Sequence, residues 1–335
     1  MFFYRANLFF VVILLVIVLG LSVIRKLNFY GHNRTYKIAL LTRNASFAQQ
    51  VTEGIMTEVE AHPEIKYDIR SFYAPGRDAL SQQSLAEEAI ADNPDIILSL
   101  GVAFIQVALN AMNKRKSTAP FIFAGSGDPV TQGLVTSVGP RTEQITGVLI
   151  GRVDYNEPIN LLLKCKPTVK NVLIPHFPAS LLGMVEQAAI DVKELCKKRG
   201  VNVYLVPLDV RSDIAAMIAP FMNKVDTVMC IEGDRIDDYN ALLVKLCESH
   251  GVTLFAKEIE SVRDGAALGF GTYAKSIGVM MMQYARKVLT GQAKASQLPV
   301  CSLDGARILV LNKAAAAKQD LPITQELLSL VDRVY

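Results

Sequence analysis

The feature that most constrains the fold of this chain is an alternation along its length. From Tyr36 onward, short apolar runs take turns with longer amphipathic segments. Short apolar runs bounded by polar residues predict buried strands, and apolar residues at helical spacing predict helices. Strands that alternate regularly with helices predict βαβ units, in which parallel sheets are covered by helices on both faces. The sequence therefore predicts an α/β protein.

The pattern also runs twice, because four βα units precede residues 139–151 and four follow them. That segment is rich in Gly and polar residues, which predicts a loop that crosses between two domains. We expect strands at residues 37–42, 67–73, 96–100, 121–124, 171–175, 202–206, 227–231 and 253–256, with further candidates at 266–269 and 307–312. We expect helices at residues 45–61, 80–93, 103–115, 181–199, 214–223, 239–250 and 276–290.

Two doubly wound lobes also predict where a ligand binds. The ligand-binding loops of such sheets follow the carboxyl ends of the parallel strands. Opposed lobes bring these loops face to face, so the cleft between the lobes is the expected binding site.

The N-terminus carries an unbroken apolar run from Leu8 to Ile24, preceded by Arg5 and followed by Arg25 and Lys26. Its length lies at the lower limit for a membrane-spanning helix and above the usual length of the apolar region in a cleavable signal. Small residues end the run and would allow cleavage after Ser22. We expect either an export signal or an uncleaved anchor at residues 8–24. Both place the protein in the periplasm or at the extracytoplasmic face of the cytoplasmic membrane.

Composition and cysteine usage exclude several classes of protein. The chain has 35 basic and 32 acidic residues and a formal net charge of +3. A nucleic-acid-binding protein should show a clustered basic face, so we expect no nucleic acid partner. The five cysteines are scattered without a CxxC pair, which argues against a disulfide framework and a zinc site. Because no cysteine lies near the end of the apolar run, a lipid anchor is also excluded.

The sequence lacks a catalytic constellation. It contains neither the GxSxG of a nucleophile elbow nor the GxxxxGK[ST] of a phosphate-binding loop. None of its four histidines belongs to an HExxH or comparable metal-binding motif. Gly269-Phe-Gly271 only begins a dinucleotide fingerprint. We therefore expect a protein that is not an enzyme and that has no catalytic residue, metal or cofactor.

An acidic cluster follows the strand expected at residues 227–231 and should lie on a loop that faces the cleft. It contains Glu232, Asp234, Asp237 and Asp238. We expect Asp237 or Asp238 to cap the next helix. For Asp234, a ligand contact and plain solvation both stay open.

Three stretches of the sequence resemble one group of ABC transporter substrate-binding proteins. APFIFAGSGDPVTQGLVTSVGPRTEQITGV, at residues 119–148, is similar to that family's run from "P-[IV]-V-F" through "DP" and "GLV" to "NITG". SVRDGAALGFGTYAKSIG, at residues 261–278, resembles "S-V-x-x-G-A-x-A-x-x-G-x-D-Y-x-x-x-G". ILVLNKAAAAKQDLPI, at residues 308–323, resembles "L-x-L-N-x-x-x-A-x-x-L-G-I-x-I-P", and residues 225–254 show a weaker similarity.

The resemblance implies a periplasmic-binding-protein fold of the first type, in which three chain crossings join the lobes. It then implies an N-terminal lobe of residues 35–150 with 271–297, a C-terminal lobe of residues 151–270 with 298–335, and a leading segment of residues 1–34. It further implies closure about a hinge around a small ligand, which is an aromatic amino acid in some members. The ligand then passes to an ABC permease and its ATPase.

The resemblance and the ends of the expected strands together give the candidate ligand-binding residues. They are Asn44, Ser46, Phe47, Gly101, Val102, Ala103, Ser126, Gly127, Asp128, Ser180, Asp234, Arg235 and Tyr273. Several have a second interpretation: Ser46 can cap a helix, Phe47 and Tyr273 can be packing residues, and Asp128 can be a turn residue. The sequence departs from the family pattern at Val102, Arg235 and Thr272, which leaves the ligand open.

Two rival functions use the same fold. One is a membrane-anchored sensor domain, motivated by an N-terminal helix that could stay uncleaved. The other is an enzyme on a two-lobed α/β scaffold, which the missing catalytic constellation argues against. A neighbouring permease gene would favour import, and a neighbouring kinase or cyclase gene would favour the sensor.

Overall fold

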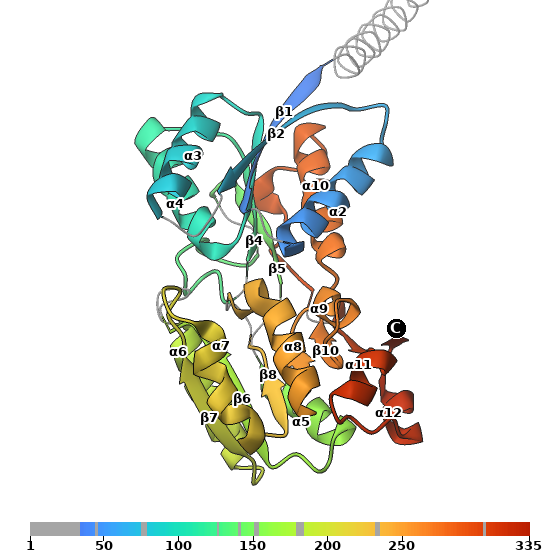
Figure 1. The fold of residues 1–335 in the computed structure, drawn as a ribbon. Coiled ribbons are helices and arrows are strands. Elements are labelled where there is room, and N and C mark those ends of the chain that lie inside the picture. The colour runs from blue at the N-terminus through green and yellow to red at the C-terminus, as the bar shows by residue number, and fades with distance from the viewer. Residues whose placement is uncertain are drawn as a thin grey trace, which may run out of the picture.

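Two β-sheets organise the part of the chain that the structure describes (Figure 1). The structure is a computed structural model and describes residues 34–43, 46–74, 79–125, 127–139, 142–150, 154–178, 184–231, 235–303 and 306–335. No helix within these ranges is long and apolar enough to span a membrane. The apolar run at residues 8–24, for which the sequence predicts a signal or an anchor, lies outside them.

The first sheet has the strand order β11-β5-β4-β3-β1-β2, and each pairing among its described strands is parallel. Its strands are β1 (Thr35–Arg43), β2 (Lys66–Ala74), β3 (Ile96–Leu100), β4 (Phe121–Gly125), β5 (Ile145–Leu149) and β11 (Cys301–Ser302). Its helices are α2 (Ser46–Glu60), α3 (Ala79–Ala91), α4 (Val102–Arg115) and α10 (Ala274–Leu289). We call this sheet with its helices the first lobe.

The second sheet has the order β13-β12-β10-β9-β8-β6-β7 and is parallel except where β12 runs antiparallel to β10. Its strands are β6 (Asn171–His176), β7 (Asn202–Pro207), β8 (Thr227–Met229), β9 (Thr253–Ala256), β10 (Leu268–Gly271), β12 (Ile308–Leu311) and β13 (Arg333–Val334). Its helices are α5 (Asn156–Cys165), α6 (Met184–Lys197), α7 (Ile214–Ile218), α8 (Asn240–His250), α9 (Ile259–Arg263), α11 (Lys313–Lys318) and α12 (Gln325–Leu330). Short 3₁₀ helices lie at η2 (Ala219–Lys224), η3 (Ile236–Tyr239) and η4 (Ala295–Gln297). We call the second sheet with α5–α9, α11 and α12 the second lobe.

Each sheet is buried on both faces because its strands are apolar at successive positions. In β1, Ile38 and Leu40 pack with α2 and α10, whereas Ala39 and Leu41 pack with α3 and α4. In the second lobe, one face packs against α5, α6, α11 and α12, and the other against α7, α8 and α9. Side chains alternate between the faces of a strand, so a nearly continuous apolar strand must be covered on both sides. The predicted α/β architecture with two largely parallel sheets is confirmed.

Helices α2 and α10 cross in direct backbone contact. A Cβ at Gly54 would lie 2.0 Å from the carbonyl oxygen of Lys275, and a Cβ at Gly278 would lie 1.8 Å from that of Val51. No side chain fits at either distance, so glycine is required at both positions. This crossing holds α10 firmly in the first lobe, although α10 directly follows a strand of the second lobe.

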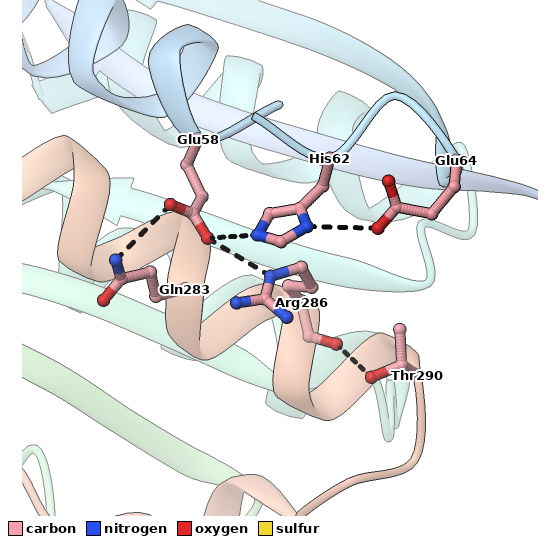
Figure 2. A network of polar contacts seen from close by, with 6 residues as sticks. All are labelled: Glu58, His62, Glu64, Gln283, Arg286 and Thr290. Atoms are coloured by element: carbon pink, nitrogen blue, oxygen red, sulfur yellow. Dashed lines mark hydrogen bonds and ion pairs between the residues drawn. The ribbon is translucent and has the colours of Figure 1, made fainter. Parts of the chain in front are cut away.

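A polar network fastens the same two helices beyond the glycine crossing (Figure 2). The largely buried carboxylate of Glu58 accepts hydrogen bonds from Gln283 Nε2 at 3.4 Å and from Arg286 Nε at 3.2 Å. His62 Nε2 lies 3.4 Å from the same carboxylate, and His62 Nδ1 lies 3.1 Å from Glu64. The network ties the C-terminal ends of α2 and α10 together.

The described elements pass between the lobes three times. The chain leaves the first lobe after β5, returns between β10 and α10, and leaves again after β11. The passage between β10 and α10 consists of Thr272 and Tyr273 alone. All three passages begin at the carboxyl end of a parallel strand, so the carboxyl edges of the two sheets face one another.

Two sequence predictions about the crossing regions differ from the structure. Residues 139–151 are predicted as a loop, but residues 145–149 form strand β5, which pairs with β4 and β11. A glycine inside this segment accounts for the missed strand. A Cβ at Gly147 would lie 2.6 Å from the ring of Phe123, so this position of a buried strand requires glycine. Residues 298–335 are expected in the C-terminal lobe, yet β11 joins the first sheet through its pairing with β5.

The helix expected at residues 214–223 is also interrupted. Helix α7 ends at Ile218 and continues as the 3₁₀ helix η2, which has Pro220 in its first turn. Proline has no backbone N–H to donate to an α-helical hydrogen bond, so it favours the change of helix type.

Candidate functional site

An open cleft lies at the carboxyl edge of the second sheet, next to the passages between the lobes. It encloses about 350 Å³, part of which is open to solvent. Its lining comes from the ends of β8, β9 and β10, from the start of α5 and from the residue before β12. The lining residues are Asp154, Tyr155, Pro158, Met229, Cys230, Phe255, Ala256, Lys257, Phe270 and Arg307.

One wall of the cleft combines an aromatic ring with a cation. The guanidinium of Arg307 lies 5.1 Å from the ring centre of Phe270, within range of a cation–π interaction. The same guanidinium lies 3.0 Å from the carboxylate of Glu157, and the side chain of Arg307 is 11% exposed. A guanidinium held flat against a ring presents its edge to carboxylates.

Asp154 adds an anion to the cleft just before α5, close enough to Arg307 for their charges to interact. Its Oδ1 accepts hydrogen bonds from the backbone N–H of Asn156 at 2.9 Å and from Asn156 Nδ2 at 3.0 Å. These bonds lower the pKa of Asp154, and the charge of Arg307 lowers it further. Asp154 is therefore ionised at neutral pH.

Lys257 is the first residue after β9 and lies in a cluster of acids. Its ammonium lies 2.6 Å from Asp237 and 3.4 Å from Glu258, and all three side chains are largely buried. Burial raises the pKa of Glu258 to about 8, and the neighbouring Asp237 acts in the same direction. Glu260 accepts from the backbone N–H of Ala274, at the start of α10, and burial raises its pKa as well.

The prediction that Asp237 or Asp238 caps the helix at residues 239–250 is wrong. Tyr239 precedes α8 and forms no capping side-chain bond, because η3 adds a 3₁₀ turn in front of the helix. Asp237 instead pairs with Lys257. Asp238 lies 3.7 Å from Arg235.

Arg235 belongs to an aromatic stack behind η3. Its guanidinium lies 5.4 Å from the ring centre of Phe177, and the rings of Phe177 and Tyr239 stack 5.6 Å apart. Phe177 follows β6 and is buried, so the stack holds η3 against the second lobe. Arg235 is partly exposed beside this stack.

In the first lobe, two glycines follow the carboxyl ends of β3 and β4. Gly101 precedes α4 with a φ of 91° and donates its N–H to the carbonyl of Ala124 at 2.9 Å. Gly127, after β4, also has a φ of 91°. The start of α4 has no side-chain cap, so its N–H groups are suited to an anionic group.

The other predicted site residues fall into four groups. Asn44, Ser126, Ser180 and Asp234 lie outside the described residues, and only the backbone of Ser46, Val102 and Ala103 is described. Phe47 packs against the core of the first lobe, and Tyr273 packs against that of the second with Arg333 5.3 Å from its ring centre. Asp128 is a turn residue that accepts from the N–H of Val130 at 3.0 Å and from the hydroxyl of Thr131 at 2.8 Å.

Sequence reasoning did not single out Lys257, Arg307 and Asp154. A usable signal exists for Lys257, because it directly follows an apolar strand at the edge where ligands bind. Arg307 was included in the strand expected at residues 307–312, but β12 begins one residue later. Asp154 lies just after the predicted crossing loop and shows no motif.

Comparison with known proteins gives matches over most of the chain. A family model described as ABC transporter substrate binding protein matches residues 57–335. A tyrosine-binding protein from Clostridioides difficile (strain R20291) is 23% identical over 236 residues, which cover 70% of this chain. The matched region spans 65% of that relative's own length.

Solved structures with the same fold include two at 18% sequence identity. One is a domain in complex with L-Trp from Streptococcus pneumoniae, with a TM-score of 0.77. The other is a conserved domain protein from Vibrio cholerae, with a TM-score of 0.79. Each match covers 90% of this chain and 100% of the other chain. At this identity the likeness shows a shared fold.

Proposed function

Because this chain belongs to the family of ABC transporter substrate binding proteins, we propose that it captures a small solute between its two lobes and delivers it to a membrane permease with its ATPase. The family consists of solute-binding proteins, and we assign no catalytic step to this member. Capture takes place at the extracytoplasmic face of the cytoplasmic membrane, in the periplasm, with residues 8–24 acting as export signal or anchor. The family match favours transport over a sensor domain.

The ligand is an amino acid, with an aromatic side chain favoured. The observation that carries this assignment is the lining of the cleft, where cations, an anion and aromatic rings meet. Lys257 and Arg307 suit a carboxylate, Asp154 suits an ammonium group, and Phe255 and Phe270 suit an aromatic ring. The tyrosine-binding relative and the L-Trp complex support the same class of ligand.

Binding closes the lobes about the passages between them. A ligand held only by the second lobe would leave the start of α4 exposed to water. Closure would bring the N–H groups of α4 to the ligand and bury it from both sides. Such closure couples occupancy to a shape that a permease can recognise. The candidate residues of the first lobe, Gly101 to Ala103 and Gly127, act through their backbones in this arrangement.

A thermal-shift screen tests the proposed function. The full chain is mixed with aromatic amino acids, other amino acids, sugars and nucleobases. A ligand at 100 times its Kd stabilises the folded state by about 2.7 kcal/mol. That corresponds to an increase in Tm of about 5 °C for a chain of this size. We expect L-tyrosine, L-tryptophan or L-phenylalanine to give such an increase. A shift from sugars or nucleobases, with none from any amino acid, would overturn the assignment of the ligand.

A further inference from the structure

We propose that Lys257 anchors the carboxylate of the bound ligand and that its neighbour Glu258 competes with the ligand for the same ammonium. This inference rests on the proposed function, since it takes the ligand to be an amino acid. It adds a specificity-determining residue and a pH limit to that site.

The position of Lys257 supports the first part. Lys257 directly follows β9 at the carboxyl edge of the second sheet, lines the cleft, and has a side chain that is only 11% exposed. Charges attract more strongly at such a desolvated position than at an exposed one. A carboxylate that enters the cleft therefore gains strongly beside this ammonium, as it does beside Arg307, whose side chain is equally buried.

The acidic partners of Lys257 compete with the ligand's carboxylate for its ammonium. Asp237 reaches the ammonium from η3 at 2.6 Å, and Glu258 reaches it from the start of α9 at 3.4 Å. The two carboxyl groups together would over-compensate one positive charge if both were ionised. A third carboxylate, from the ligand, would then meet a net negative site. The ligand binds well only while one of the two acids is neutral.

Glu258 is the acid that is neutral at physiological pH. Burial and the nearby charge of Asp237 raise its pKa to about 8, although Lys257 acts in the opposite direction. Glu260, on α9, adds a further acid that raises the pKa of Glu258. On η3, Arg235 and Asp238 form their own pair at 3.7 Å.

The cleft itself carries a nearly balanced charge around Lys257. Asp154 and Arg307 line the cleft in two of the three passages between the lobes, and they bring one negative and one positive charge. Cys230 lines the cleft and is buried. Among these groups, Glu258 has the raised pKa that places its ionisation near pH 8.

The expected pH dependence follows from this assignment. Below pH 8 Glu258 keeps its proton, and the ligand's carboxylate is opposed mainly by Asp237. Above pH 8 Glu258 ionises and competes. If the ionised form does not bind the ligand, affinity falls by about tenfold between pH 7 and pH 9. Binding should also take up protons near pH 8, because the ligand's carboxylate favours the neutral form of Glu258.

Calorimetric titration of the full chain with L-tyrosine and with tyramine tests the inference. Tyramine keeps the ring and the amine but lacks the carboxylate. We expect Lys257→Met to weaken L-tyrosine binding at least tenfold and to leave tyramine binding within twofold of wild type. We expect Glu258→Gln to bind L-tyrosine at pH 7 and to lose the tenfold decline between pH 7 and pH 9.

The exposed ion pair between Lys318 and Glu248 supplies matched controls in the same lobe, with 3.1 Å between its charged atoms. Lys318→Met and Glu248→Gln should titrate like wild type. If Lys257→Met keeps its affinity for L-tyrosine, or if Glu258→Gln keeps the alkaline decline, this inference is wrong while the proposed function stands. If the wild-type chain binds no amino acid at any pH, both are wrong. Melting curves of each variant identify any loss of folding, and the pH profile of the wild-type chain needs no variant.

Discussion

A buried lysine lies at each edge of the second sheet, and the two have different partners. At the amino edge, Lys166 Nζ donates to the carbonyl of Asp226 at 3.1 Å and to the hydroxyl of Thr253 at 2.9 Å. Its nearest carboxylate, on the exposed Asp320, is 3.7 Å away. At the carboxyl edge, Lys257 is held by the carboxyl groups of Asp237 and Glu258. One lysine has mainly neutral partners, and the other has acids.

This difference indicates that the amino edge of the sheet, around Lys166, serves stability. Around Lys166 the polar groups bind one another in a closed set, and Thr253 passes its own hydrogen bond to the carbonyl of Gln319 at 2.9 Å. Neutral partners cannot be displaced by an incoming anion. Around Lys257 a ligand's carboxylate can replace an acid of the same chemistry. Ligands of parallel α/β sheets bind at the carboxyl edge of the sheet. Lys257, whose acidic partner a ligand's carboxylate can replace, lies at that edge.

The largest effect should come from the amino edge. The fully buried Gln319 accepts from the N–H of Leu254 at 2.9 Å and of Ala267 at 3.2 Å, and it donates to the carbonyl of Gly265 at 2.8 Å. Gln319→Ala leaves three buried backbone groups without partners. We expect unfolding in urea to lose about 4 kcal/mol. Ligand affinity measured on the remaining folded protein should be unchanged. A loss below 1 kcal/mol would show that the amino edge contributes little to stability.

A smaller effect is expected for Lys166→Met, which keeps the length of the side chain and removes its two hydrogen bonds. We expect a loss of about 2 kcal/mol at pH 7, because the desolvation of the charge offsets part of what the bonds contribute.

The pH dependence of this variant sharpens the comparison. Burial lowers the pKa of Lys166 in the folded protein. A lowered lysine pKa means that the folded state binds the proton less tightly than the unfolded state does. The contribution of Lys166 to the free energy of unfolding therefore rises as the pH increases from its folded-state pKa toward its unfolded-state pKa. Below the folded-state pKa this contribution is smaller. We expect the deficit of Lys166→Met to grow between pH 7 and pH 10 in urea titrations. A deficit that shrinks over this range would contradict the assignment.

The alternation of apolar runs predicted the two-lobed fold because buried parallel strands have a strong local signature. It failed at β5, where Gly147 and Thr146 interrupt the apolar pattern. Glycine is required at position 147 because the ring of Phe123 fills the space of a Cβ, and only the folded chain brings those residues together. The carboxyl ends of the expected strands pointed to the edge of the second sheet at which the cleft lies. They could not distinguish Asp128, whose carboxylate binds its own turn, from Lys257, since that depends on contacts with other segments.

Asp237→Asn should give the smallest loss of stability. It should also increase ligand affinity. This variant removes the closest negative charge from Lys257 and keeps the shape of the side chain. We expect the free energy of unfolding to fall by about 1 kcal/mol, because the asparagine keeps a neutral hydrogen bond to the ammonium in place of the charged one. Removing this charge also lowers the pKa of Glu258, so the titration is done in a Glu258→Gln background. If the ammonium is then more available to the ligand by a similar amount, affinity for L-tyrosine at pH 7 rises by about fivefold relative to Glu258→Gln alone.

Asp264→Asn is the matched control, because this exposed aspartate pairs with Arg263 at 3.3 Å in the same lobe. It should leave affinity within twofold of wild type in the same calorimetric titration. An unchanged or weaker affinity of Asp237→Asn in the Glu258→Gln background would mean that the ligand does not reach Lys257. The two lysines would then both be structural, and the carboxyl edge would differ from the amino edge only in the charge of its partners.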